Sequence, residues 1–507
     1  MAQLKNVGYD LRLSGVKMGL FNKSSKNGSD SKDNAPRYPM TIGGHSVSAK
    51  EWDAVINPYD LSTVGYAPKA TAKHLDDAVR AAQSAFKEWS RRSSEDRANA
   101  CLQVAKIFEE NAPMLSELIT KEQGKPLDAG GFGSGFEVGG CIGWSQATSA
   151  INLEDKVIVE GDGVTAIEKH VPIGVIGSIT PWNWPLLIAV WHFIPAIRAG
   201  NTVVVKPSEN TPLSTLKAIE LLNEVLPAGV LNVVAGAGEI GAAMSSHAGI
   251  DKIVFTGSTA TGKRVMASAS ENVTRCTLEL GGNDPAIVLP GAPVEAMAPG
   301  LFFGSFINAG QTCGAIKRIY VHENEYDQTC DILADIASKT TVGDGLQAAT
   351  DMGPIQNKDQ YEKVRRLTRE AQADGAELLV GGEQVGDGYC LTPAILKNCR
   401  NGMSIVDEEQ FGPVVPVIKY SSVEDAVEFA NDSEFGLCAS VWGTDGEALQ
   451  SVSDQLVAGT VYVNTHAELN PMVPFGGVKS SGIGVQFGEA GLKGVTETKV
   501  VYERRPN

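Results

Sequence analysis

Apolar positions along the chain predict a helical N-terminal part followed by alternating strands and helices. Apolar residues recur at three- and four-residue spacing in HLDDAVRAAQSAFKEWS (74–90) and RANACLQVAKIFEENAPMLSELITKEQG (97–124), which predicts amphipathic helices. Between 172 and 290, all-apolar segments such as TVVVKP and KIVFTG alternate with helical ones and end at AIVLPG (286–291). This alternation is typical of a doubly wound parallel sheet, which binds nucleotides at the carboxyl ends of its strands.

A second α/β pattern follows, with strands expected near RIYV, VVPVIKY and TVYVN. KVIVEGDGVTAIEKHV (156–171) reads as an extended hairpin with its turn at GDG, and ETKVVYERR near the C-terminus is also strand-like. The expected fold class is therefore α/β. It comprises a Rossmann-like nucleotide-binding domain (37–150 and 172–284), an α/β catalytic domain (285–485) and a small β extension (151–171 and 486–507).

Two segments do not fit the regular pattern. Residues 1–36 include the polar tract NKSSKNGSDSKDNA, which cannot bury apolar surface, so we expect a flexible leader. The run GGFGSGFEVGGCIGW (130–144) places many glycines between helical flanks. Each glycine costs about 1 kcal/mol in a helix relative to alanine. Either the helix breaks in this run or it packs closely against another backbone.

Composition narrows the function classes. The chain has 507 residues, enough for two or three domains, and its net charge of −17 argues against a nucleic-acid partner. Its eight cysteines are scattered, which indicates neither a disulfide framework nor a metal site. No apolar run reaches the roughly 20 residues of a membrane helix. These features predict a cytoplasmic enzyme without a membrane partner.

One cysteine lies in a setting that suits a nucleophile. In FFGSFINAGQTCGAIKRIYV (302–321), Cys313 is surrounded by small and polar residues on a tight connection before a strand. Free cysteines are often small core residues, and that alternative stands beside the catalytic one. Thiolate chemistry, however, needs hydrogen-bond donors and exposure rather than an apolar wall.

Two glycine-containing turns could bind phosphate. GAGEIG (236–241) matches GxGxxG between a strand and a helix, but the next strand lacks the acidic residue that completes the fingerprint. FTGSTATG (255–262) is the better candidate. Gly257 allows close backbone approach, and Ser258 with the first free amides of the next helix can face a pyrophosphate.

Seven segments together resemble the aldehyde dehydrogenase superfamily. They are TPWNWPL (180–186), KPSE (206–209), FTGS (255–258), LELGGN (278–283), GQTC (310–313), EEQFGPV (408–414) and PFGGVKSSGIG (474–484). They occur in the order and at the intervals of that family, from about residue 40 to the end. The resemblance implies NAD-dependent oxidation of an aldehyde to a carboxylic acid.

The resemblance assigns the catalytic roles. Cys313 matches the nucleophile that forms a thiohemiacetal and then a thioester. The amide of Asn183, with the backbone N–H of Cys313, matches the oxyanion hole. Glu279 matches the base that activates water, and it favours hydrolysis over transfer of the acyl group to coenzyme A. A coenzyme A-acylating semialdehyde dehydrogenase and a thiol acyltransferase or hydrolase remain alternatives.

Cofactor contacts carry over position by position. Lys206 and Glu209 match residues that hold the adenosine ribose, and a carboxylate there repels a 2′-phosphate, which favours NAD over NADP. Trp182 and Ser258 match pyrophosphate contacts, while Glu409 and Phe411 match residues at the nicotinamide ribose and ring. Gly236 and Gly238 match the adenine wall. The expected cofactor-binding set is Thr180, Trp182, Lys206, Glu209, Gly236, Gly257, Ser258, Leu280, Glu409 and Phe411.

The expected substrate pocket is largely apolar: Trp184, Trp191, Ile307, Thr312, His466 and Phe475. No arginine at these positions could pair with a semialdehyde carboxylate, and no evident cage suits a quaternary ammonium group. An uncharged medium-chain aliphatic or aromatic aldehyde is therefore expected. The resemblance also implies a homodimer or tetramer formed through the β extension.

The sequence departs from the family at a pair of positions. His192 and Gln486 stand where many members carry a lysine and a glutamate thought to relay protons. The relay is then either absent or routed through His192 and water. The second possibility predicts a pH–rate profile with a group that titrates near neutrality. A histidine that only packs a helix is the alternative.

Overall fold

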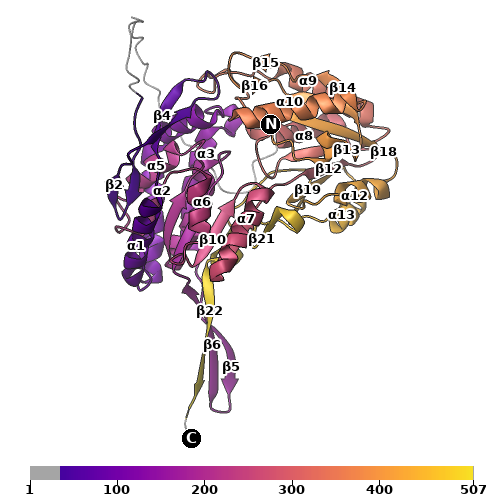
Figure 1. The fold of residues 1–507 in the computed structure, drawn as a ribbon. Helices are drawn as coiled ribbons and strands as arrows, with labels where there is room; N and C mark the ends of the chain where they lie inside the picture. Colours follow the sequence, from indigo (N-terminus) through magenta and orange to yellow (C-terminus); the bar gives the residue numbers. More distant parts are fainter. Residues whose placement is uncertain (1–34, 506–507) are drawn as a thin grey trace, which may run out of the picture.

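The computed structural model describes residues 35–505, arranged as two large sheets with flanking helices and a thin projecting arm (Figure 1). The leader predicted at 1–36 lies almost entirely outside these residues. The first sheet has the order β2 (His45–Val47), β1 (Met40–Ile42), β9 (Leu231–Val233), β8 (Thr202–Lys206), β7 (Val175–Ile179), β10 (Lys252–Thr256), β11 (Arg275–Glu279) and β21 (Gly482–Ile483). Its five central strands, β9 to β11, are parallel.

The strand order creates a switch point in this sheet. From β7 the chain steps outward to β8 and β9, and then returns to place β10 and β11 on the other side of β7. The carboxyl ends of β7 and β10 therefore face a crevice, which is where doubly wound sheets bind ligands. The helices of this part are α1 (Ala72–Trp89), α2 (Ser94–Gln123), α3 (Ser134–Ala150), α4 (Pro185–Ala199), α5 (Leu213–Leu222), α6 (Gly238–Ser245), α7 (Thr259–Ala269) and α14 (Gly488–Gly494).

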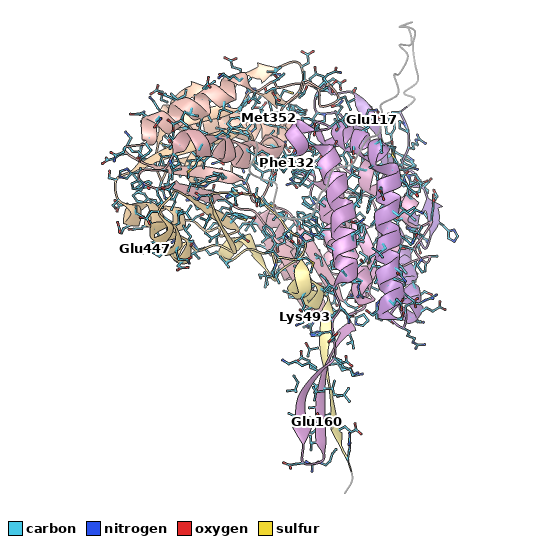
Figure 2. The ribbon with its side chains drawn as sticks, turned by 180° about the vertical axis from the view of Figure 1, so that it is seen from behind. Glu117, Phe132, Glu160, Met352, Glu447 and Lys493 are labelled. Atoms are coloured by element: carbon cyan, nitrogen blue, oxygen red, sulfur yellow. The ribbon has the colours of Figure 1, made fainter. Side chains whose placement is uncertain are left out.

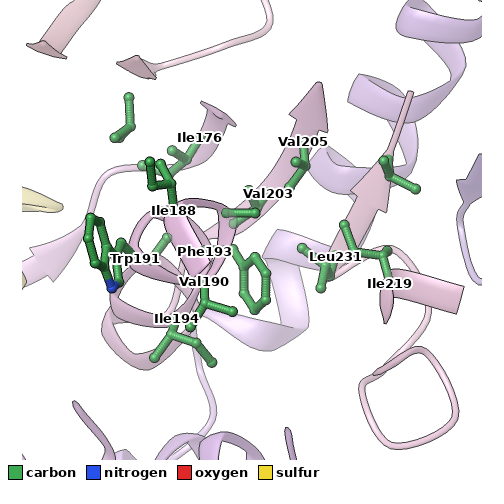
Figure 3. Close-up of a cluster of buried hydrophobic side chains, with 14 of the residues drawn as sticks. Ile176, Ile188, Val190, Trp191, Phe193, Ile194, Val203, Val205, Ile219 and Leu231 are labelled. Atoms are coloured by element: carbon green, nitrogen blue, oxygen red, sulfur yellow. The ribbon is translucent and has the colours of Figure 1, made fainter. Parts of the chain in front are cut away.

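The core of the first part forms between α4 and the central strands. Figure 3 shows Val190 and Phe193 of α4 beside Val203 and Val205 of β8, all with no exposed surface. Burying each such side chain contributes about 1.5–3 kcal/mol. Because α4 is apolar around nearly its whole circumference, it packs beneath α2 and α3 as well as on the sheet. This fixes α4, and with it the loop that carries Asn183.

The second sheet has the order β14 (Glu377–Val380), β17 (Ala394–Cys399), β18 (Val414–Tyr420), β13 (Ile316–His322), β12 (Asp284–Val288), β19 (Cys438–Trp442) and β20 (Thr460–Val463). Only β14 runs antiparallel. Its helices are α8 (Val294–Phe306), α9 (Tyr326–Lys339), α10 (Lys358–Ala373), α11 (Ser404–Asp407), α12 (Val423–Asn431) and α13 (Gly446–Gln455). The AIVLPG strand, expected to end the first series, is part of β12 and pairs with β13 and β19 instead.

The extended segments form a three-stranded sheet, β22 (Thr496–Arg504), β6 (Val164–Pro172) and β5 (Lys156–Gly161). The hairpin predicted at 156–171 is confirmed, with its turn at Gly161 to Gly163. The arm projects from the body, with Glu160 at its tip and Lys493 at its base (Figures 1 and 2). Residues 488–494 form α14, which packs against α4, so only the last strand joins the arm.

Two small hairpins, β3 (Trp52–Ile56) with β4 (Thr63–Pro68) and β15 (Gln384–Val385) with β16 (Cys390–Leu391), complete the strands.

The glycine-rich run both breaks a helix and packs closely. Gly130 and Gly131 have φ values of 67° and 98°, and α3 begins only at Ser134. A Cβ at Gly133 would lie 2.1 Å from the Pro126 carbonyl oxygen, and one at Gly140 would lie 2.9 Å from the side-chain atom Leu187 Cδ1 of α4. The run therefore breaks the helix, its closest approach to another backbone is at Gly133 before α3, and at Gly140 the close neighbour is a side chain. Within residues 35–505, no helix is long and apolar enough to cross a membrane.

Candidate active site

The predicted cofactor residues follow the carboxyl ends of the parallel strands. Thr180 follows β7, Lys206 ends β8, Gly257 follows β10 and Glu279 ends β11. The ladder registers Ile179 with Lys206 and Thr256 with Glu279, so these ends lie at one edge of the sheet. The structure therefore brings together residues that are up to 100 positions apart.

This edge has features that fit a dinucleotide. The hydroxyl of Thr180 is buried and has no hydrogen-bond partner within residues 35–505. Ser258 caps α7 by accepting from the N–H of Thr261, which leaves the first turn of that helix facing outward. Glu209, whose side chain is half exposed, lies 3.5 Å from Lys206, and the Lys206 ammonium donates to the carbonyl of Gly236 at 2.7 Å.

Other predicted cofactor residues line the same region. The Trp182 and Phe411 rings meet edge to face with centroids 5.4 Å apart. Leu280 packs beneath α7, because a Cβ at Gly262 would lie 2.4 Å from its Cδ2 atom. Glu409 accepts from the N–H of Gly282 at 3.1 Å. Gly238 opens α6 after β9, and further along this helix a Cβ at Gly241 would lie 3.7 Å from the Lys206 stem.

Cys313 lies on a strained connection between α8 and β13. Asn308 and Ala309 have φ values of 52° and 54°, in the left-handed region that non-glycine residues rarely adopt. Gly310 must be glycine here, since a Cβ would lie 2.3 Å from the Gly412 carbonyl oxygen. These turns direct Cys313 into a cavity instead of the core.

The charges around Cys313 keep it protonated at rest. Burial raises the pKa of its thiol to about 12, with Asp284, Glu279 and Glu409 adding to the increase and Lys317 opposing it. The thiol still lines the cavity and is half-buried rather than sealed off. A base or a positive charge must therefore assist its ionisation.

Asn183 is held on three sides. Its side-chain N–H donates to the carbonyl of Gln311 at 2.9 Å, which leaves the second proton of the amide free. The backbone carbonyl of Asn183 accepts from the Lys125 ammonium at 2.8 Å and from the side-chain amide of Asn308 at 2.9 Å. Within residues 35–505, the backbone N–H of Cys313 donates to no protein group. Two donors are thus available beside the nucleophile.

Glu279 has no hydrogen-bond partner among the described residues, although it is 4% exposed. Burial raises the pKa of its carboxyl well above the ordinary value. Burying a carboxylate without a partner costs free energy. Carboxyls with a pKa shifted in this way cluster at functional sites. Its charge reaches Cys313, since it helps raise the pKa of that thiol.

An apolar cavity leads to Cys313. Its empty volume, including the open mouth, is about 690 Å³. Five of the six predicted pocket residues line it: Trp184, Trp191, Ile307, Thr312 and Phe475. The Trp184 ring N–H donates to the Thr312 hydroxyl at 3.0 Å, which removes one polar group from the wall.

His466 does not line this cavity. Its side chain is buried 3.7 Å from Asp284 and beside the Tyr462 ring, while its neighbour Ala467 contributes to the wall. The prediction of His466 as a pocket residue is therefore wrong in position. The sequence pattern placed its loop correctly but could not determine which side chain turned inward.

Several wall residues were missed. Phe132, Phe136 and Trp144 come from the glycine-rich run, and Phe132 lies between the two halves of the molecule (Figure 2). Phe136 and Trp144 are eight residues apart on α3, a spacing that places them on one face of a helix and was visible in the sequence, whereas Phe132 precedes the helix. Tyr462 and Leu469 complete this wall from the second half.

The surroundings of His192 oppose titration near neutrality. Both ring nitrogens lie 2.9 Å from hydroxyls, Nδ1 from Ser178 and Nε2 from Thr256, and burial lowers its pKa to about 3. A neutral ring satisfies both contacts, which favours an absent relay over a relay through His192 and water. Gln486 is buried, its side-chain nitrogen has no partner among residues 35–505, and its backbone pairs with Phe475.

Comparison with known proteins identifies the family. The sequence profile of the aldehyde dehydrogenase family matches residues 46–501. A putative aldehyde dehydrogenase, FUS7, of Gibberella fujikuroi is 39% identical over 91% of this chain and 97% of its own length.

Solved structures agree with this match. An aldehyde dehydrogenase variant from Bacillus cereus superposes with a TM-score of 0.90 at 35% identity, covering 92% of this chain and 96% of its own. A betaine aldehyde dehydrogenase from Staphylococcus aureus, solved in complex with NAD+, gives 0.89 at 33% identity, over 93% and 95%. The chain belongs to the aldehyde dehydrogenase family.

Proposed function

We propose that this enzyme oxidises an uncharged aldehyde to the carboxylic acid with NAD as cofactor. One observation carries the proposal: Cys313 lines an apolar cavity, and the Asn183 amide donates to the carbonyl of Gln311, two residues before this cysteine. The buried, unpaired carboxylate of Glu279 is close enough to influence the same thiol. Together these groups supply a nucleophile, an oxyanion donor and a base.

The residues act in sequence. The Cys313 sulfur attacks the aldehyde carbon, and its proton leaves to a base, to give a thiohemiacetal. Asn183 and the Cys313 N–H stabilise the oxyanion, a contribution of about 3–4 kcal/mol per donor in related chemistry. NAD, when bound, would supply the hydride acceptor that the oxidation of the thiohemiacetal to the thioester needs. Glu279 then removes a proton from water, which attacks the thioester and releases the acid and the Cys313 thiol.

The choice of NAD over NADP rests on the Lys206–Glu209 pair. The Glu209 carboxylate is exposed and 3.5 Å from a lysine held by the Gly236 carbonyl. Such a carboxylate can accept from a ribose 2′-hydroxyl and repels a 2′-phosphate. The NAD+ complex of the Staphylococcus aureus relative supports this assignment.

The cavity wall supports the substrate class. Its lining is dominated by aromatic and aliphatic side chains, and no arginine or lysine is among them. A carboxylate on the substrate would lose its hydration without gaining a partner. Medium-chain aliphatic and aromatic aldehydes gain the most from this wall, at about 25 cal/mol per Å² buried.

The arm is proposed to mediate self-assembly. Apolar side chains on its two outer strands are largely exposed, with Val157 at 52%, Ile158 at 51%, Val500 at 58% and Tyr502 at 66%. Both outer strands also present a free edge. A second copy of the chain would cover this surface in a dimer or tetramer.

The test is NADH formation with NAD and a panel of aldehydes, with and without coenzyme A. Turnover without coenzyme A, lost in Cys313→Ala but kept in Cys276→Ala, would support the proposal; Cys276 is a half-exposed cysteine in β11. Glu279→Gln should release about one equivalent of NADH per site and then stall, because the thioester is not hydrolysed.

Three outcomes would contradict parts of it. A strict need for coenzyme A in the wild type would favour the acylating alternative. Substrate hydrolysis without NAD would favour a thiol hydrolase. A strong preference for a charged semialdehyde or betaine aldehyde would refute the substrate class while leaving the mechanism intact.

A further inference from the structure

A buried lysine lies directly beneath the nucleophile. Lys317, the second residue of β13, has a side chain only 3% exposed. Its ammonium donates to the carbonyls of Thr312 at 2.8 Å, Cys313 at 3.1 Å and Ala315 at 3.3 Å. All three donors of the ammonium are therefore used on the nucleophile loop.

The groups that act on the Cys313 thiol come from several elements. Within residues 35–505 they are Lys317 on β13, Glu279 on β11, Asp284 on β12 and Glu409 after α11, while the neighbouring thiol of Cys438 on β19 is itself influenced by Cys313. Lys317 is the positive charge in this set. Burying a cation costs a large desolvation free energy, even among carboxylates. A buried lysine at this place is therefore a candidate for a functional role.

Lys317 also connects the nucleophile loop to the predicted cofactor residues. Its ammonium lies 3.9 Å from Glu409 and 5.7 Å from the centre of the Phe411 ring. Glu409 also accepts from the N–H of Gly282. The negative charge of Glu409 thus partly offsets the positive charge of Lys317.

We propose that Lys317 is a positioning residue for Cys313: it holds the nucleophile loop through three carbonyls and supplies the positive charge that favours the thiolate. The inference rests on the proposed role of Cys313. Lys317 acts through the backbone and through its field and does not touch the reacting sulfur. In agreement with this geometry, its charge lowers the pKa of Cys313 against the effect of burial.

The experiment measures the alkylation rate of Cys313 by iodoacetamide against pH, followed by mass spectrometry of the Cys313 peptide. Lys317→Met should slow alkylation about tenfold at pH 8 and move the profile to higher pH, because an opposite charge at this range changes a thiol pKa by a unit or more. Glu409→Gln should move it to lower pH, since the lysine charge is then less offset.

Lys252→Met is the matched control. Lys252 is also buried, but it begins β10, at the opposite edge of the sheet from the site. The alkylation profile of Lys252→Met against pH should coincide with that of the wild type. Thermal melting of each variant reports folding, and Lys317→Gln replaces Lys317→Met if the latter does not fold.

An unchanged or lower-pH profile in a folded Lys317 variant would overturn the proposal. So would an unchanged profile in Glu409→Gln, which decides the question if neither Lys317 variant folds. The readout is the chemistry of one thiol, so it stands apart from the proposed function. Loss of activity in Cys313→Ala tests that function and leaves the alkylation result untouched.

Discussion

Breaking the buried ion pair between Lys125 and Glu137 should impair both stability and turnover. The Lys125 ammonium lies 2.5 Å from the Glu137 carboxylate, and the two side chains are 1% and 0% exposed. The other carboxylate oxygen of Glu137 accepts the first free amides of α4, from Leu186 at 2.9 Å and Leu187 at 3.2 Å. The pair therefore caps the helix that follows the Asn183 loop.

Lys125 connects this cap to the oxyanion donor. It donates to the Asn183 carbonyl at 2.8 Å and lies 3.5 Å from the centre of the Trp184 ring. Glu137→Gln keeps an acceptor for α4 but leaves the ammonium without its counter-charge. Removing one partner of a buried pair costs about 3–5 kcal/mol. Burial already lowers the pKa of Lys125 to about 8, so the ammonium can lose its proton in the variant. The expected loss of stability is therefore near the lower end of this range, about 3 kcal/mol.

A double-mutant cycle measures the pair itself. Lys125→Met leaves Glu137 with two backbone donors, so its cost should be smaller, about 2 kcal/mol. The double variant should lose less than the sum of the single losses, with a coupling of about 2 kcal/mol. Thermal unfolding of the four proteins gives the cycle, and steady-state assays should show a lower kcat with little change in the cofactor KM.

An exposed pair on α2, the helix that ends just before Lys125, is the control. Lys121 and Glu117 of α2 lie 2.6 Å apart, nearly the same distance, but their side chains are 39% and 55% exposed. Removing either should cost well under about 1 kcal/mol. If Glu137→Gln were as mild as this control, or if the cycle were additive, the assignment of the buried pair as a support for Asn183 would be refuted.

Three further predictions follow from burial and packing. Because burial raises the pKa of Glu279 and a base must be unprotonated, hydrolysis-limited turnover should rise with pH, and Glu279→Gln should remove that rise. His192→Ala should keep the wild-type shape of the pH–rate profile, since the ring is neutral above its pKa of about 3, while lost hydrogen bonds lower stability by about 1–3 kcal/mol; a lost inflection near neutrality would contradict this. Gly140→Val should destabilise α3 by about 1–3 kcal/mol through the contact with Leu187, whereas Gly143→Ala, with open space around it, should raise the melting temperature slightly; equal effects would refute the packing argument.

The sequence predicted the parallel arrangement because buried strands leave a strong signal. Once the strands are parallel, their carboxyl ends must share an edge, which is why residues as distant as Thr180 and Glu279 could be expected together. Pairing partners were harder to predict. The β12 strand is as apolar as the strands before it, so nothing local indicated that it would join the second sheet.

The buried charges were the least predictable part of the site. Lys317 and Arg318 follow each other in the sequence, and both are 2% exposed within a central strand. Two adjacent basic residues at the start of an apolar strand were a visible sign that something nearby must compensate them. Most of the compensating groups are backbone carbonyls, which no side-chain pattern reveals; Glu409 near Lys317 and the Tyr320 hydroxyl at Arg318 add to them. His466 shows a different limit of prediction from sequence. Its loop reaches the cavity through Ala467, but the His466 side chain is not part of the cavity wall.

Two glutamates of this site differ in environment far more than in sequence. Glu279 and Glu409 each lie close to glycines after an apolar or acidic residue, and pattern alone could not separate their roles. In the structure Glu279 has no partner within residues 35–505, whereas Glu409 accepts from Gly282 and lies 3.9 Å from Lys317. Burial raises the pKa of both carboxyls, but Lys317 and the N–H of Gly282 oppose this increase only at Glu409. This difference supports the proposed division of roles, with Glu279 as the base and Glu409 at the cofactor ribose.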